Sequence, residues 1–114
     1  MLWHMYRHKR EGAVIAIIWR YQVAPASARQ FEQAYGSNGD WAKLFGQAEG
    51  YIRTELLRGG DGDYLTIDYW LAADAWEAFS THQAEAYRAL DVRCDALTEA
   101  EERIGLFAVE SGRN

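Results

Sequence analysis

The two residue types that cross-link or stiffen a polypeptide are nearly missing: the 114 residues include one cysteine and one proline. A single thiol, Cys94, excludes a disulfide within the chain, and nothing in the cysteine usage indicates an oxidising compartment. We therefore expect a cytoplasmic protein. A chain of this length forms one domain and buries a core of its own.

Positive charge is scarce as well. Twelve Lys and Arg stand against 17 Asp and Glu, and the net charge of −5 argues against binding to nucleic-acid phosphates. The apolar segment AVIAIIW is too short to cross a bilayer, and the first 12 residues have no apolar run after their charges, unlike a signal peptide. We expect a poorly ordered extension over 1–12, a single domain over 13–114, and no membrane association. The alternative for 1–12 is an arm that docks on a partner through Trp3 and Tyr6.

Aromatic side chains, by contrast, are abundant, with five Trp, seven Tyr and four Phe. The hydrophobic share of 49% and the charged share of 25% are those of an ordinary soluble globular protein. So many rings indicate a large-walled core, a ligand pocket or an interface, and composition alone leaves all three open.

The hydrophobic pattern predicts the order β, α, α, β, β, α, β. A strand over 13–23 ends before Pro25, and two short helices follow, over 27–36 and 37–50. Two strands, 51–58 and 63–70, flank GGDG and predict a β-hairpin. A helical stretch over 73–97, with a break near Ser80 and Thr81, precedes a last strand over 103–110. Capping boxes are predicted at Ser27 and Thr98.

This order is the split βαβ arrangement of ferredoxin-like α+β folds, in which helices cover one face of a four-stranded antiparallel sheet. The first and last strands are apolar on both faces, so the uncovered face would expose a large apolar patch. Two copies packed sheet to sheet would cover it, and we expect this homodimer.

The hairpin gathers the most varied side chains. One face of its second strand presents an aromatic ring, a hydroxyl, a carboxylate and an indole: Tyr64, Thr66, Asp68 and Trp70. Pairing Arg58 with Asp63 sets a register that places Arg53 opposite Asp68. The interpretations are a structural ion pair, a base at Asp68 whose carboxylate is tuned by Arg53, or an Arg53 that anchors a phenolate.

The segments VIAIIWRYQVAP, GYIRTELLR, YLTIDYWLAADAWEAF and LTEAEERIGLF follow one another in this order. The series resembles the antibiotic biosynthesis monooxygenase (ABM) domains of the dimeric α+β barrel superfamily, over roughly residues 13–110. The resemblance implies a protomer that dimerises through its sheet and has a pocket between sheet and helices. Some members oxidise aromatic polyketides or quinols with O2 and need neither metal nor flavin, whereas others degrade haem.

Cofactor-free oxygenation requires an electron-rich phenol or quinol that, once deprotonated, gives an electron to O2 by itself. The protein supplies an apolar slot, a base or hydrogen bond that favours the phenolate, and exclusion of water. We assign the polar part of such a site to Asp68, Arg53, Thr66 and His82. The resemblance implies an Asn at the position of Thr66 and a His near the position of His82, at the pocket mouth, where it can accept a proton near neutral pH.

The residues that we assign to substrate binding are all aromatic: Trp41, Tyr51, Trp70, Trp76 and Phe79. The predicted register places Tyr51 opposite Trp70. The resemblance implies that Trp70 and Trp76 wall the pocket, while the simpler alternative makes both of them core fillers.

Haem turnover is not expected, because haem-degrading members carry an iron-ligating His about ten residues after a helix aromatic. Here Phe79 takes the aromatic place and Ala89 lies ten residues beyond it. We therefore expect no metal and no cofactor. The leading hypothesis is a cofactor-independent monooxygenase acting with O2 on an aromatic, phenolic or quinol molecule. The alternative is a non-catalytic dimeric module that binds small molecules or serves a stress response.

Overall fold

The computed structural model describes residues 13–110, so the extension predicted over 1–12 lies outside the described residues. The strands are β1 (Ile15–Gln22), β2 (Tyr51–Arg58), β3 (Asp63–Trp70) and β4 (Ala100–Ala108). The helices are α2 (Ala28–Tyr35), α3 (Asp40–Phe45), α4 (Ala73–His82) and α5 (Ala84–Cys94), with 3-10 turns η1 (Pro25–Ser27) and η2 (Asp95–Leu97).

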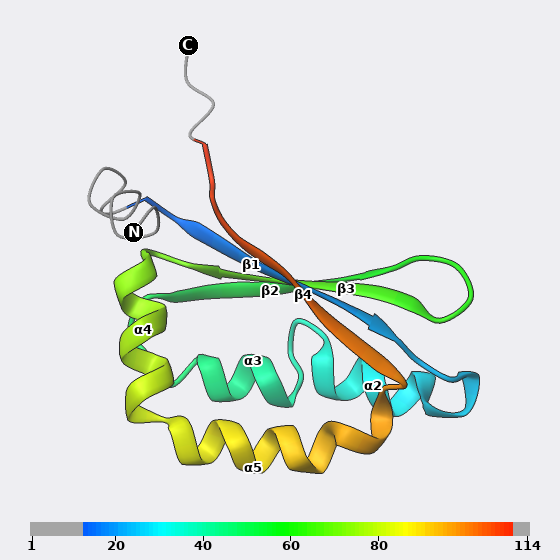
Figure 1. Ribbon diagram of the computed structural model, residues 1–114. Coiled ribbons are helices and arrows are strands. Elements are labelled where there is room, and N and C mark those ends of the chain that lie inside the picture. Colours follow the sequence, from blue (N-terminus) through cyan, green and yellow to red (C-terminus); the bar gives the residue numbers. More distant parts are fainter. Residues whose placement is uncertain (1–12, 111–114) are drawn as a thin grey trace.

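One antiparallel sheet, in the order β2-β3-β1-β4, forms a single layer, and the helices all lie against one of its faces (Figure 1). The predicted α+β fold of split βαβ type is therefore confirmed. Along β3 every second residue is buried, because the helices cover only one face of the sheet.

Aromatic rings fill most of the space between the sheet and the helices. Phe31 of α2 and Trp70 of β3 are fully buried, at 0% exposed. Phe45 of α3 packs against Trp70, Trp76 and Phe79 with ring centroids 5.6, 6.2 and 5.3 Å apart. Each such ring stabilises the fold by roughly 1.5–3 kcal/mol through removal of apolar surface from water. Most of the aromatic residues thus form the hydrophobic core.

Three predicted boundaries differ from the structure. The long helix breaks at Gln83, whose φ of −114° and ψ of 28° are not helical, two to three residues after the predicted break. No side-chain hydrogen bond caps α2 at Ser27, and no helix begins at Thr98. Instead β4 begins at Ala100, because that polar segment already pairs with the end of β1.

The β2–β3 hairpin is confirmed, but its predicted register is wrong by one residue. Asp61 and Gly62 take positive φ values of 56° and 80° and form a two-residue turn closed by the Asp63 amide donating to the Gly60 carbonyl, 3.1 Å away. The Gly59 amide also donates to the Asp63 carbonyl, at 2.6 Å. Two residues therefore oppose one, which is a β-bulge that shifts the pairs of β2 from Arg58 to Arg53.

This shift moves Arg53 to the other face of the sheet, because side chains alternate with a period of two. Arg53 lies opposite Tyr69, and Thr54 lies opposite Asp68. A second bulge, at Ile52, restores the predicted pairing of Tyr51 with Trp70.

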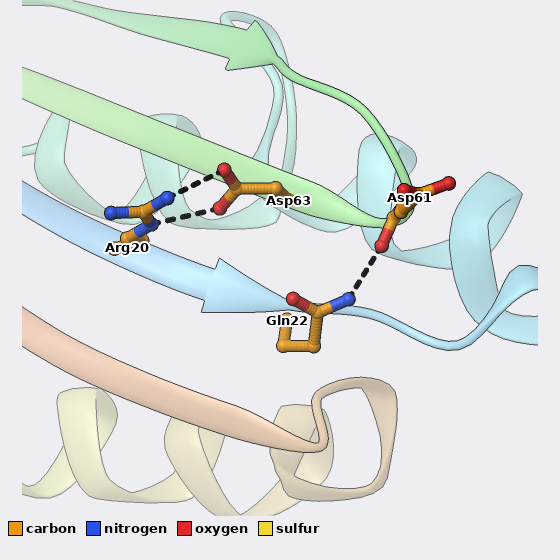
Figure 2. A network of polar contacts seen from close by, with 4 residues as sticks. All are labelled: Arg20, Gln22, Asp61 and Asp63. Carbon is orange, nitrogen blue, oxygen red and sulfur yellow. Dashed lines mark hydrogen bonds and ion pairs between the residues drawn. The ribbon is translucent and has the colours of Figure 1, made fainter.

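The sheet face turned away from the helices is apolar at its centre. Its residues, by their pairing, include Ala16, Ile18, Leu57, Leu65, Ile67 and Phe107. Leu57 and Phe107 are 45% and 48% exposed. At the turn end of this face, Arg20 donates to both carboxylate oxygens of Asp63 at 2.9 and 2.8 Å, and Gln22 donates to the Asp61 carbonyl at 2.6 Å (Figure 2).

The hairpin turn yields a matched pair of glycine variants. Gly62→Ala places a methyl group in a left-handed backbone, 2.2 Å from the Val23 carbonyl oxygen, whereas an added Cβ at Gly60 meets nothing within 4 Å. We expect Gly62→Ala to lower the free energy of unfolding by roughly 2–4 kcal/mol and Gly60→Ala to change it by less than about 1 kcal/mol. Urea unfolding monitored by tryptophan fluorescence measures both, and equal losses would contradict this account of the turn.

Candidate active site

A cavity of about 230 Å³ lies between the inner face of the sheet and α2, α3 and α5. Its wall is aromatic with a few polar groups: Trp19, Tyr21, Tyr35, Trp41, Phe45, Thr54, Thr66, Asp68, Tyr87, Asp91 and Glu101. A neighbouring hollow of about 420 Å³ shares Trp19, Tyr87 and Asp91 with it and adds Trp76 and Arg88. Apolar walls with a few convergent polar groups are typical of small-molecule sites.

Asp68 is the carboxylate at the sheet side of this cavity and is only 9% exposed. It sits on β3 between Thr66 and Trp70, on the face that the helices cover. Thr54, on the neighbouring strand, donates a hydrogen bond of 2.6 Å from its hydroxyl to Asp68 Oδ1. No other donor or cation contacts this carboxylate within residues 13–110, so its charge is balanced only weakly.

Burial raises the pKa of Asp68 to about 6, and the hydrogen bond from Thr54 opposes that rise. A carboxylate with this pKa is ionised at neutral pH and still binds a proton readily. Such a group can act as a general base, and a strongly perturbed carboxyl in a cavity is a frequent mark of a functional site.

The phenols of the cavity wall remain protonated near neutral pH. Burial raises the pKa of Tyr21 and Tyr35, and raises that of Tyr87 to about 12. Glu101 at the cavity edge has a raised pKa, because burial and the charges of Asp91 and Asp95 disfavour its ionised form. The phenols can therefore donate hydrogen bonds to a ligand, while Asp68 is the deeply buried group able to accept a proton.

Arg53 does not lie beside Asp68 as predicted, because its side chain is on the opposite face of the sheet. Its guanidinium is 3.3 Å from the Glu55 carboxylate and stacks 4.2 Å from the Tyr69 ring centroid. The expected Arg53–Asp68 pair does not form, so neither the structural ion pair nor tuning of Asp68 by Arg53 holds. The cause is the bulge at the hairpin turn, which the sequence pattern did not reveal.

The other predicted residues divide between the cavity and its surroundings. Thr66, 4% exposed, and Trp41 line the cavity beside Asp68, and Trp76 lines the neighbouring hollow. Trp70 is fully buried in the core, where it contacts Tyr51.

Phe79 and His82 face a separate hollow beside α4. Phe79 is 2% exposed and His82 is exposed at the end of the helix. Both line a hollow of about 610 Å³ that includes Gln47 and Leu71 and shares no residue with the cavity around Asp68. The structure therefore does not bring His82 together with Asp68 and Thr66.

Several wall residues were missed by the sequence reasoning. Trp19 and Tyr21 could have been found, because they alternate with Ile18 and Arg20 on β1 and pair with Thr66 and Tyr64. Thr54 could not, because its contact with Asp68 depends on the register shift.

Within residues 13–110, no three His, Cys, Asp or Glu side chains are grouped so that they could hold a metal ion. No helix in that range has the length and apolar character needed to cross a membrane.

The sequence profile of the family described as antibiotic biosynthesis monooxygenase matches residues 14–90. Among solved structures, an asparagine-to-alanine variant of SnoaB, a cofactor-independent oxygenase from Streptomyces nogalater, is 25% identical with a TM-score of 0.71, covering 87% of this chain and 95% of that one. A protein of Caulobacter crescentus described as an antibiotic biosynthesis monooxygenase shares 19% identity, with a TM-score of 0.66 and coverage of 94% and 100%.

Rv0793 from Mycobacterium tuberculosis has the same fold, with 12% identity, a TM-score of 0.62 and coverage of 90% and 100%. None of the curated proteins is similar enough in sequence to match. The family profile spans more than half of the chain, and the structural similarities cover nearly all of it. This chain belongs to the antibiotic biosynthesis monooxygenase family.

Proposed function

We propose that this protein is a cofactor-independent monooxygenase that oxidises a phenolic or quinol aromatic molecule with O2. The observation that carries the proposal is Asp68, a buried carboxylate with a pKa of about 6 in the wall of an aromatic cavity. Similarity to SnoaB, a cofactor-independent oxygenase, supports the reaction class. The flat rings of Trp19, Trp41 and Tyr87 suit stacking on a flat substrate.

The mechanism begins when Asp68 removes the phenolic proton of the bound substrate. The resulting phenolate transfers one electron to O2, and the superoxide combines with the substrate radical to form a C–O bond at a ring carbon that carries hydrogen. The peroxide takes the proton held by Asp68, and loss of water from this hydroperoxide breaks the O–O bond and leaves a carbonyl. One oxygen atom thus enters the product and the other leaves as water. Burial of the base excludes water and leaves the phenolate in surroundings of low dielectric constant. Thr66 lies beside Asp68 on the same face of β3 and offers a hydroxyl to the substrate oxygen.

The proposed assembly is a homodimer packed through the outer face of the sheet. That face carries half-buried or exposed apolar side chains, among them Ile18, Ile67 and Phe107. An apolar surface of this extent is more stable when a second copy covers it, and packing about a two-fold axis lets the same surface serve both partners.

Loss of the base is expected to abolish turnover. Asp68→Asn keeps the size of the side chain and its acceptor for Thr54 but cannot take a proton, so we expect oxygen consumption to fall by roughly 10²–10⁴-fold. An oxygen electrode with a panel of anthrones and hydroquinones, under chelator and without added flavin, measures this. Asp61→Asn, the same change at an exposed residue of the hairpin turn whose left-handed backbone asparagine tolerates, is the matched control. Ligands that raise the melting temperature without any oxygen uptake would favour a non-catalytic binding module.

The same variant is expected to be more stable than the wild type at high pH. The pKa of Asp68 is raised from 3.8 to about 6 in the folded state, so the native protein loses stability as pH rises between these values. Above pH 6 the penalty is about 3 kcal/mol, since each pKa unit corresponds to about 1.4 kcal/mol. Asp68→Asn removes that penalty at pH 8 and gains nothing at pH 4. Urea unfolding at both pH values tests this, and a loss of stability at pH 8 would contradict it.

The dimer is tested by one charge on the outer face. Ile67 pairs with Ile18 at the centre of that face, and Ile67→Glu would bury a carboxylate in the proposed interface. Light scattering after size exclusion is expected to give twice the mass of one chain for the wild type and one chain mass for the variant. Val92→Glu, on an α5 residue that is 69% exposed, is the control and should remain dimeric. A wild type that elutes as a monomer would contradict the proposal.

A further inference from the structure

Asp68 is the end of a short chain of hydrogen-bonded groups. The Thr54 hydroxyl lies 2.6 Å from Asp68 Oδ1, and the Tyr51 hydroxyl lies 2.7 Å from Thr54 Oγ1. A threonine hydroxyl has one hydrogen, and the carboxylate can only accept. The Thr54 hydrogen therefore points at Asp68, and the Tyr51 phenol donates to Thr54. The bond to the carboxylate is shorter than an average hydroxyl hydrogen bond, as expected where the acceptor is charged, and the bond between Tyr51 and Thr54 has an ordinary length.

A β-bulge makes this chain possible. Tyr51 and Thr54 are three positions apart, so in a regular strand their side chains would point to opposite faces of the sheet. The register shift between Tyr51 and Arg53 leaves Ile52 as the extra residue, 38% exposed, and turns Tyr51 to the inner face. Bulges commonly redirect a side chain next to a functional site.

The contacts leave the two carboxylate oxygens of Asp68 with different roles. Oδ1 is held by Thr54, which is itself only 3% exposed and fixed by Tyr51. Asp68 lines the cavity, so Oδ2 is the oxygen available to a ligand there. A β-branched side chain such as threonine has few alternative rotamers, and the hydrogen bonds on both sides restrict it further.

We propose that Thr54 is a positioning residue, whose hydroxyl, oriented by Tyr51, fixes Asp68 with Oδ2 toward the cavity and favours the ionised carboxylate that accepts the substrate proton. The proposal deepens the proposed function and depends on it for the identity of the proton donor. It adds a role for two β2 residues that contact the base rather than the reacting atoms.

Thr54 is the group near Asp68 that counteracts the rise in its pKa caused by burial. Burial raises the pKa of Asp68, and the Thr54 hydrogen bond lowers it. The other titratable groups near it are phenols and acids: Tyr21 on β1, Tyr35 on α2, Tyr51 on β2, Tyr87 and Asp91 on α5, and Glu101 on β4. None of these favours a negative charge on Asp68 through charge attraction, so removing the Thr54 hydroxyl should raise its pKa further.

The test compares Thr54→Val with Thr54→Ser. Valine keeps the shape of the side chain and removes the hydroxyl, and serine restores the hydroxyl. The readout is the carboxyl carbon of Asp68, followed by NMR from pH 4 to 9 in the protein without substrate. We expect a midpoint near 6 in the wild type, a rise of about one to two pH units in Thr54→Val, and return to within about half a unit in Thr54→Ser. Thr81→Val, at an exposed helix position, should leave the midpoint unchanged.

A second variant and a second readout guard against a folding defect. Tyr51→Phe removes only the group that orients Thr54 and should raise the midpoint by a smaller amount. In turnover assays, the acid limb of kcat/KM should move with the NMR midpoint, so that Thr54→Val loses at least about fivefold at pH 6 and little at pH 9.

The outcomes separate this inference from the proposed function. An unchanged Asp68 midpoint in Thr54→Val, or failure of serine to restore it, overturns the positioning role even if the protein oxidises phenols. A shifted midpoint with no oxygen uptake from any substrate supports the positioning role and removes the oxygenase assignment.

Discussion

Everything in this fold depends on a layer of aromatic rings packed against one face of the sheet. Near Trp70, the last residue of β3, the rings of Trp70, Phe45 and Phe79 fill the space between strands and helices. Toward the middle of the sheet, the inner face carries the short side chains of Thr54, Thr66 and Asp68, which line the cavity. The cavity opens where these short side chains face rings that cannot collapse onto them. The same layer of rings thus stabilises the fold and forms one wall of the candidate site.

The element order and the face of β3 were predictable because they depend on local pattern. Alternation along β3 reports which residues face inward, and Thr66 and Asp68 do face the cavity. The hairpin register was not predictable from GGDG, since the same four residues permit a plain four-residue loop or a two-residue turn with a bulge. Because of this bulge, Asp68 lies opposite Thr54 and not opposite Arg53. A charge pair was expected where the molecule has a neutral hydrogen bond.

The helix side of the site was harder to predict than the strand side. Helical spacing shows which residues face the sheet but not which hollow each one reaches. His82 and Trp76 both lie on α4, yet they line different hollows. Tyr87, on the next helix, lines the same cavity as Asp68, and the residues around it in the sequence gave no sign of this. Which cavity a helix side chain lines depends on how the helices pack on the sheet, and the sequence pattern does not give that packing.

The family resemblance implied an amide at position 66, where this chain has Thr66. Two positions further along the same face stands Asp68, which is buried and has no cation within hydrogen-bonding reach among residues 13–110. An amide stabilises a substrate oxygen by a hydrogen bond, whereas a carboxylate can also remove its proton. Keeping a carboxylate ionised in such surroundings destabilises the fold, so packing does not account for an aspartate at this position, whereas the proposed proton transfer does. The fold is the family's, and the group that we propose as the base in its cavity wall is Asp68.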